Sequence, residues 1–158
     1  MLFIKNSPIF YLTKYYIMFT LYLTYRLNTV FNGKFNSVCE LEYKIYILEN
    51  VEQEIEHMKD KTAQKKILQS LKRLSKTIPN NPEKWRSIKC KNKKNIGAYE
   101  LKSKPYRLGC YKYGKYILVV HMWRVQKDIS LQKRNDIEKA CLIIEEVQDE
   151  FKGFVKRI

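Results

Sequence analysis

Three strand-like runs near the middle of the chain predict the centre of the fold. In each run, apolar or aromatic residues alternate with other residues, as they do on a half-buried strand. The runs are Tyr99–Lys102, Tyr106–Tyr113 and Tyr116–Trp123. Gly114-Lys115 allows a tight reversal between the last two runs, and Ile117–Val120 is apolar on both faces, which is typical of a covered central strand. The pattern therefore predicts an antiparallel meander.

Helical periodicity precedes the meander. Glu42–Leu48 alternates as a first strand, and Asn50 with Gln53 forms a capping-box pattern that predicts a helix directly after that strand. A second helix is predicted to begin at Thr62, because apolar residues recur there at three- and four-residue spacing. The stretch Pro79–Pro82 ends it. The two helices are expected to form a hairpin that covers one face of the sheet.

A closing helix with a single apolar stripe is predicted from about Leu131 to Gly153. The order of elements predicts an α+β fold, with a small antiparallel sheet, an N-terminal helical hairpin on one face of the sheet and a C-terminal helix. A chain of 158 residues with 45% hydrophobic content can bury one core and is too short to be expected to hold two.

Residues 1–40 are predicted to be an apolar, basic extension of helical character, and residues 41–158 a self-contained domain. Residues 1–38 contain no acidic residue. The uncharged run Tyr15–Tyr25 is shorter than the roughly 20 apolar residues that a membrane-spanning helix needs, and no small-residue cleavage site of a secretory signal follows it. Three interpretations remain open: an interfacial helix in contact with a membrane, an element that packs on the domain, and a start codon placed too early.

The formal net charge of +15, from 31 Lys and Arg against 16 Asp and Glu, predicts a polyanionic partner. RNA, DNA and an anionic membrane surface are the candidates, and a coding bias towards Lys, Asn, Ile and Tyr is the alternative explanation. The four cysteines are Cys39, Cys90, Cys110 and Cys141. Their spacing forms no CxxC or CxxH pair that could start a zinc site. We expect reduced thiols in a cytoplasmic protein.

A basic segment, Glu83–Lys94, precedes the meander and holds Trp85 among its cations. We interpret it either as an edge strand around Ile88 and Cys90 or as a solvated loop that protects the edge of the sheet. If the partner is RNA, cations of this segment and of the meander are expected to contact its phosphates. The candidate RNA-binding residues are Arg86, Lys89, Lys91, Lys93, Lys94, Lys112 and Lys127.

Several segments, taken in order, resemble the RelE/ParE superfamily of toxins from bacterial type II toxin–antitoxin systems, and most closely its phage-related HigB-like branch. The resemblance covers roughly Leu41 to Phe151. The segments that carry it are Tyr43–Val51, Tyr99–Lys102, Tyr106–Leu108, Leu118–Trp123, Lys127 and Asp136–Ala140. The chain departs from the family pattern at Trp123, where Phe is more familiar, and at Arg124–Lys127, which replaces closely spaced lysines.

The resemblance implies a cytoplasmic, ribosome-dependent endoribonuclease that cuts messenger RNA and thereby inhibits translation. It also implies a small antitoxin, expected to be a helix-turn-helix protein from the adjacent gene. Cleavage by the ribose 2′-hydroxyl needs a base, an acid and a cation at the phosphoryl oxygens, and requires no metal or cofactor. Arg107 suits the phosphoryl oxygens, Lys102 is the candidate base, His121 the candidate acid with Tyr113 or Tyr111 as a substitute, and Arg124 a further catalytic cation.

Each of these residues also has an alternative explanation, in which it serves the fold or the solvated surface and takes no part in catalysis. His121 lies in an apolar strand and is expected more often as a hydrogen-bonded core histidine, whereas Arg107 and Lys102 could be solvated strand residues. A different class of function is a ParE-like binding module that inhibits DNA gyrase without cutting RNA. A third is a basic, nucleic-acid- or membrane-associated protein with a decayed toxin domain. Lys102, Arg107 and an imidazole or phenol on a single face would favour the nuclease.

Overall fold

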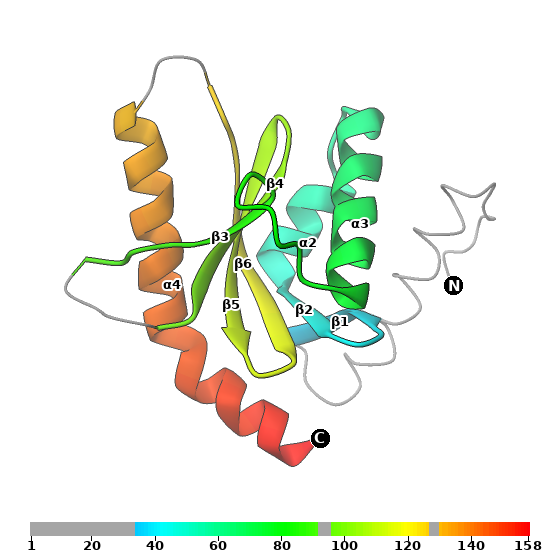
Figure 1. Cartoon of the computed structure of the whole chain (residues 1–158), viewed down its shortest axis with the longest axis vertical. Helices are drawn as coiled ribbons and strands as arrows, with labels where there is room; N and C mark the ends of the chain where they lie inside the picture. The colour runs from blue at the N-terminus through cyan, green and yellow to red at the C-terminus, as the bar shows by residue number, and fades with distance from the viewer. Residues whose placement is uncertain (1–33, 92–95, 127–129) are drawn as a thin grey trace.

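The computed structural model describes residues 34–91, 96–126 and 130–158, which form a six-stranded mixed sheet with helices on both faces (Figure 1). The strand order is β1-β2-β6-β5-β4-β3. The strands are β1 (Phe35–Glu40), β2 (Lys44–Leu48), β3 (Trp85–Ser87), β4 (Ala98–Ser103), β5 (Tyr106–Tyr113) and β6 (Tyr116–Arg124). The helices are α2 (Glu49–Glu56), α3 (Lys61–Lys76) and α4 (Ser130–Arg157).

The predicted meander is confirmed as β4, β5 and β6, which pair antiparallel in chain order. Gly114, at φ 61°, makes the reversal from β5 to β6, because glycine adopts positive φ without a steric penalty. The side chains of Ile117, Leu118, Val119 and Val120 are all fully buried, so the prediction of a covered central strand is also confirmed. This strand lies between β5 and β2 and carries the centre of the hydrophobic core.

Strand β1 was missed by the sequence pattern, because its buried run Phe35–Val38 includes the polar residues Asn36 and Ser37. It pairs antiparallel with β2, and β2 pairs parallel with β6. The prediction of a purely antiparallel sheet is therefore wrong, and the sheet is mixed. The sheet also begins at Phe35, ahead of the expected domain boundary at residue 41. Residues 1–33 of the predicted extension lie outside the described residues.

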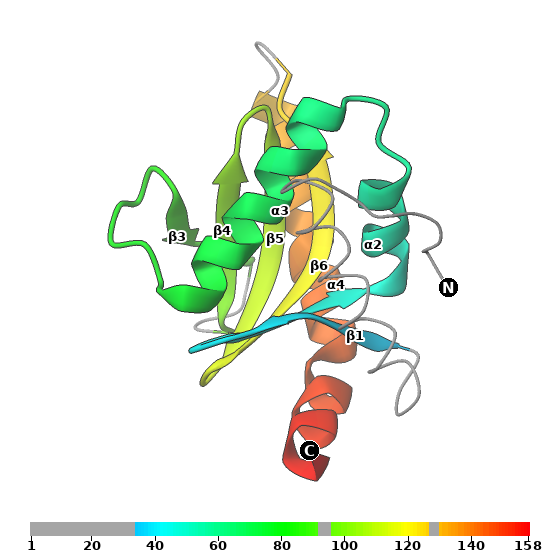
Figure 2. The same cartoon turned by 90° about the vertical axis from the view of Figure 1, so that its right-hand side faces the viewer.

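Helices α2 and α3 cover one face of the sheet, and α4 covers the other (Figures 1 and 2). The predicted hairpin on one face is confirmed. The predicted capping box at Asn50 is wrong: α2 begins at Glu49, and Gln53 Nε2 donates to the Glu49 carboxylate at 3.1 Å. The side chain of Asp60 caps α3 by accepting from Ala63 N at 3.0 Å.

Helix α4 continues through Gly153, where the sequence predicted its end, because Phe151 and Phe154 both pack against the sheet. The Phe154 ring lies 5.4 Å from the Phe35 ring of β1 and 5.3 Å from the Tyr46 ring of β2. Burial raises the pKa of the Tyr46 hydroxyl. Among the described residues, no helix combines the length and the apolar composition that crossing a membrane requires.

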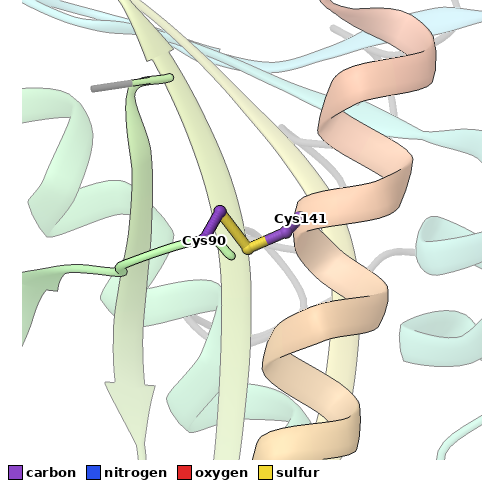
Figure 3. Close-up of a disulfide and its surroundings, with 2 residues drawn as sticks. All are labelled: Cys90 and Cys141. Carbon is purple, nitrogen blue, oxygen red and sulfur yellow. A yellow bond between two sulfur atoms is a disulfide. The ribbon is translucent and has the colours of Figure 1, made fainter. Parts of the chain in front are cut away.

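Cys90 and Cys141 form a disulfide that joins the segment after β3 to the middle of α4 (Figure 3). The expectation of four reduced thiols is therefore wrong for this pair. Spacing along the chain could not reveal it, because the cysteines are 51 residues apart in sequence and approach only when α4 packs on the sheet. Cys39 and Cys110 are free, and burial raises the pKa of the Cys110 thiol.

Replacing Gly109 with alanine is expected to lower the free energy of unfolding by about 1–3 kcal/mol, because the added Cβ would lie 2.8 Å from Ala140 Cβ on α4. Gly153→Ala is the matched control. Its Cβ would meet only the flexible Arg157 side chain, at 3.4 Å, and alanine favours the helix by about 0.5–1 kcal/mol. Urea denaturation of both variants measures the two changes. Unchanged stability of Gly109→Ala would contradict the close approach of β5 and α4.

Thiol counting tests the disulfide. In protein purified without reductant, we expect one thiol, Cys39, to react rapidly with a colorimetric thiol reagent in the native state. Cys110 is expected to react only after denaturation, because it is buried and its thiolate is disfavoured. Cys90 and Cys141 are expected to react only after reduction. Four reactive thiols in the denatured, unreduced protein would rule out the bridge.

Candidate functional site

The α4 face of β4, β5 and β6 carries most of the chemically active side chains of the meander. Lys102 pairs across the strands with Arg107, and Arg107 pairs with Trp123. Side chains of directly paired residues share one face of a sheet, so these three form a row. Gly109 stands two residues after Arg107 in β5 and therefore lies on the same face of the sheet. It packs against Ala140 of α4, so this is the face that α4 covers.

A register shift in β6 determines that His121 also faces α4. Gly109 pairs with His121, whereas the next residue, Cys110, pairs with Val119, so Val120 is an extra residue in β6. Such a bulge reverses the alternation of side chains beyond it. Leu118, the partner of Tyr111, faces α4 on one side of the bulge, and His121 faces α4 on the other side. Without the bulge, the imidazole would point towards α2 and α3.

Glu100 is a fully buried carboxylate held between two arginines. Arg86 donates from Nε to Glu100 Oε1 at 2.9 Å, and its Nη2 lies at the same distance from that oxygen. Arg107 Nε lies 2.9 Å from Glu100 Oε2. This second contact is ionic, because Oε2 accepts no aligned hydrogen bond. The buried negative charge therefore orients both guanidinium groups on the α4 face.

The alternative explanation of Arg107, as a solvated strand residue, does not agree with these contacts. Its side chain is 14% exposed, and Nη1 donates to the Tyr106 carbonyl at 3.1 Å. Lys102 is equally covered, at 14%, and its Nζ lies 4.0 Å from the exposed Glu83 carboxylate. Two cations are thus held side by side at the end of β4 and β5, which gives a fixed positive field at this point of the surface.

His121 is largely buried and hydrogen-bonded, as its structural interpretation expected. Its Nε2 lies 3.0 Å from Asp136 Oδ1 on α4, and its ring stacks on Trp123 with centroids 5.5 Å apart. A carboxylate at this distance fixes the orientation of the imidazole ring. The pair is therefore compatible with a proton-transfer role as well as with packing of α4.

The other predicted catalytic residues lie apart from this group. Tyr113 is at the opposite end of β5 from Arg107, with the Lys152 ammonium 5.6 Å from its ring. Tyr111 is buried against Phe151, and burial raises the pKa of its hydroxyl. Arg124 pairs with Tyr106 and so lies on the face opposite to Arg107, with its guanidinium 5.9 Å from the Tyr106 ring. Lys102, Arg107 and His121 lie on the α4 face in the same part of the sheet, towards the Arg107 end of β5.

The four predicted RNA-binding residues that the structure describes do not form one surface. Arg86 pairs with the buried Glu100, and Lys91 pairs with Glu138 of α4 at 2.8 Å. Lys112 lies on the α2–α3 face, with its ammonium 5.9 Å from the Tyr43 ring, and Lys89 is exposed after β3. Lys93, Lys94 and Lys127 lie outside the described residues. The expected edge strand is shorter than predicted, because β3 ends at Ser87.

Sequence reasoning missed Glu100 and Asp136 as parts of this site. Glu100 stands in an ordinary alternating run between Tyr99 and Leu101, and nothing local distinguishes it from a solvated strand residue. Asp136 lies near the start of α4, one turn before Ala140 on the side of the helix that faces the sheet. Their partners come from other elements, so tertiary packing alone identifies them. No group of three or more His, Cys, Asp or Glu residues in the described segments is placed to hold a metal ion.

The fold and these contacts define an α+β protein with a partly buried cationic site between its sheet and its last helix. A protein of Aquifex aeolicus (strain VF5), described as an uncharacterized protein, is 34% identical to the chain over 115 residues. The match covers 70% of the chain and 84% of the relative, so the chain belongs to the same family as the Aquifex protein. No protein-family model matches the chain, and no solved structure matches it significantly.

The contacts of Glu100 with Arg86 and Arg107 predict that loss of the Glu100 charge destabilises the protein. Glu100→Gln keeps the side-chain shape but removes the charge between Arg86 and Arg107, and we expect the free energy of unfolding to fall by about 1.5–3 kcal/mol. The matched control is Glu42→Gln, which removes a carboxylate from the exposed pair with Lys115 and should change stability by less than about 0.5 kcal/mol. Thermal and urea denaturation measure both. Equal effects would show that Glu100 contributes no more than a surface charge.

Proposed function

We propose that this protein is the toxin of a type II toxin–antitoxin system, a HigB-like member of the RelE/ParE superfamily that cuts messenger RNA on the ribosome in the cytoplasm. The observation that carries the proposal is the row of Lys102 and Arg107 on the same sheet face as His121. A module that only binds its target has no need for two cations and an imidazole on one face. The order of elements, with a helical hairpin, a meander and a closing helix, supports the same proposal.

The chemistry proposed is internal attack by the ribose 2′-hydroxyl on the adjacent phosphorus. The new bond joins the 2′-oxygen to phosphorus, and the bond from phosphorus to the 5′-oxygen breaks, which leaves a 2′,3′-cyclic phosphate and a 5′-hydroxyl. Arg107, oriented by Glu100, stabilises the charge on the phosphoryl oxygens. Lys102 has the role of the general base that removes the 2′-proton, and His121 has the role of the general acid that protonates the 5′-oxygen. Every proton removed is thereby returned to a leaving group or to the solvent.

Asp136 acts in this proposal as a positioning residue. Its carboxylate lies 3.0 Å from His121 Nε2 and thereby fixes the orientation of the imidazole ring. Because His121 is only 9% exposed beneath α4, entry of RNA requires the first turns of α4 to separate from β6. The close packing of Ala140 against Gly109 anchors α4 beyond Asp136, so this movement is confined to the part of the helix that precedes Ala140.

The partners in this proposal are messenger RNA, the ribosome and an antitoxin, expected to be a helix-turn-helix protein encoded beside this gene. An antitoxin that binds α4, or that covers the ends of β4 and β5 at Lys102 and Arg107, would block access to the site. Membrane contact through residues 1–38 is not needed for the proposed activity. Residues 34–158 and the full chain can be expressed in separate cultures. A comparison of growth in the two cultures would show whether the preceding segment affects toxicity.

Induction of the chain in bacteria is expected to arrest growth and to create new 5′-hydroxyl ends in translated messages. Lys102→Gln should reduce cleavage by at least about 10²-fold, the lower end of what a positioned general base contributes. Lys115→Gln, which removes the same charge from an exposed pair in the β5–β6 turn, should cleave as the unmodified protein does. Mapping of messenger 5′ ends after induction measures both.

Arg107→Lys complements these variants. It keeps a positive charge beside Glu100 but loses the planar fork that contacts phosphate at two points, so cleavage should fall while the melting temperature changes little. Arg107→Ala is less informative, because it also leaves Glu100 with a single partner. Intact messages accompanied by broken chromosomal DNA would favour gyrase inhibition instead. Equal cleavage by Lys102→Gln and Lys115→Gln would remove Lys102 from the mechanism.

A further inference from the structure

A second basic feature lies on the opposite face of the sheet, where α3 packs beside the outer strands. It is a pocket of about 500 Å³ between α3, the segment that enters β3, and the end of β4. Its charged lining comes from three separate parts of the chain, and these residues are Lys66, Arg73, Glu83, Lys84, Lys102 and Lys104. Five of these six residues are cations, although the sequence pattern singled out only Lys102 among them.

Most of the positive charge around this pocket is not neutralised by the protein. Within the described segments, the carboxylate paired with a lining cation is Glu83, whose Oε1 lies 4.0 Å from Lys102 Nζ. Lys66, Arg73, Lys84 and Lys104 are exposed, and no contact to a carboxylate is found for them in the same segments. Cations of like charge around one hollow repel each other, and this unfavourable energy is relieved when an anion binds between them.

The chemistry of the lining favours a phosphate group. Arg73 offers a planar fork that pairs with two phosphate oxygens, and the lysines add point charges from the other walls. Gln69 and Ser70, one helical turn from Lys66 and Arg73, add neutral hydrogen-bonding groups. A volume of about 500 Å³ is within the range of pockets that hold small ligands, so the hollow is larger than a single anion requires.

We propose that this pocket, the α3–β4 pocket, binds a phosphate group carried by a nucleotide unit. Two sources share that chemistry: a phosphodiester of a single-stranded RNA, and the phosphates of a free nucleoside diphosphate. The pocket borders Lys102, which also lies in the row with Arg107, so an RNA bound at that row could continue into it. The proposal does not rest on the proposed ribonuclease activity, because phosphate binding here requires no bond to break.

The experiment compares two double variants of the full chain. Lys66→Gln with Arg73→Gln removes two cations of the pocket. Lys65→Gln with Lys76→Gln removes two exposed cations from the same helix, one in its second turn and one in its last turn, that do not line the pocket. Both changes lower the net charge by two, and Arg73 and Lys76 make similar contributions to the helix C-terminus.

Binding is measured with two probes, a fluorescent single-stranded oligoribonucleotide whose 2′-hydroxyls are all methylated, and ADP. The first probe cannot be cut by internal attack, so its binding is independent of catalysis. We expect the pocket variant to bind one of the probes roughly tenfold or more weakly, and the control variant to bind both as the unmodified chain does. If RNA is the ligand, the slope of the logarithm of the binding constant against the logarithm of the salt concentration should also become shallower, by about 0.7 per lost phosphate contact.

Each outcome has a definite meaning for the α3–β4 pocket. Loss of oligoribonucleotide binding alone identifies an RNA backbone as the source of the phosphate, and loss of ADP binding alone identifies a free nucleotide. Equal losses for the pocket and control variants would overturn the proposal, because general electrostatic attraction would then explain the binding. Failure of the unmodified chain to bind either probe would overturn it as well, and would leave the cleavage experiment on Lys102→Gln unaffected.

Discussion

Strand β6 is covered by α4 on one face and by α2 on the other, and its residues from Ile117 to Val120 are fully buried. A strand buried on both faces cannot slip by one residue without exposing its apolar side chains. Its register with β5 is therefore strongly determined, and β5 in turn determines the register of β4. The positions of Arg107, Lys102 and His121 relative to one another follow from this burial.

The contact between β5 and α4 adds a second requirement. Gly109 leaves room for Ala140, so α4 lies close to the sheet at the point where Asp136, one turn earlier on the helix, meets His121. A larger residue at either position would move the helix away and separate this pair. The Cys90–Cys141 bridge ties the next part of the same helix to the segment after β3. Packing, a hydrogen bond and a covalent link therefore hold α4 over the same region of the sheet.

The chain carries a formal charge of +15, yet the charge that organises the α4 face is negative. A buried carboxylate without partners would be costly, so Glu100 is stable only with Arg86 and Arg107 beside it. These arginines are thereby held in place, whereas most of the other cations in the described segments are exposed to solvent. The proposed nuclease uses Lys102 and the oriented Arg107 of this face, and the α3–β4 pocket is lined by Lys102 together with exposed cations of α3 and of the segments beside β3 and β4.

Local pattern was sufficient to predict the meander, the helical hairpin and the closing helix, because alternation and helical spacing report which side of an element is buried. It also placed Lys102 and Arg107 on strands that pair. It did not predict β1, because Asn36 and Ser37 are buried although polar, and it did not predict the parallel pairing of β2 with β6. The bulge at Val120, the partners of Glu100, the disulfide and the α3–β4 pocket all depend on residues far apart in the sequence. Only the tertiary structure decided these features, because each one arises from contacts between elements whose own sequences do not specify their neighbours.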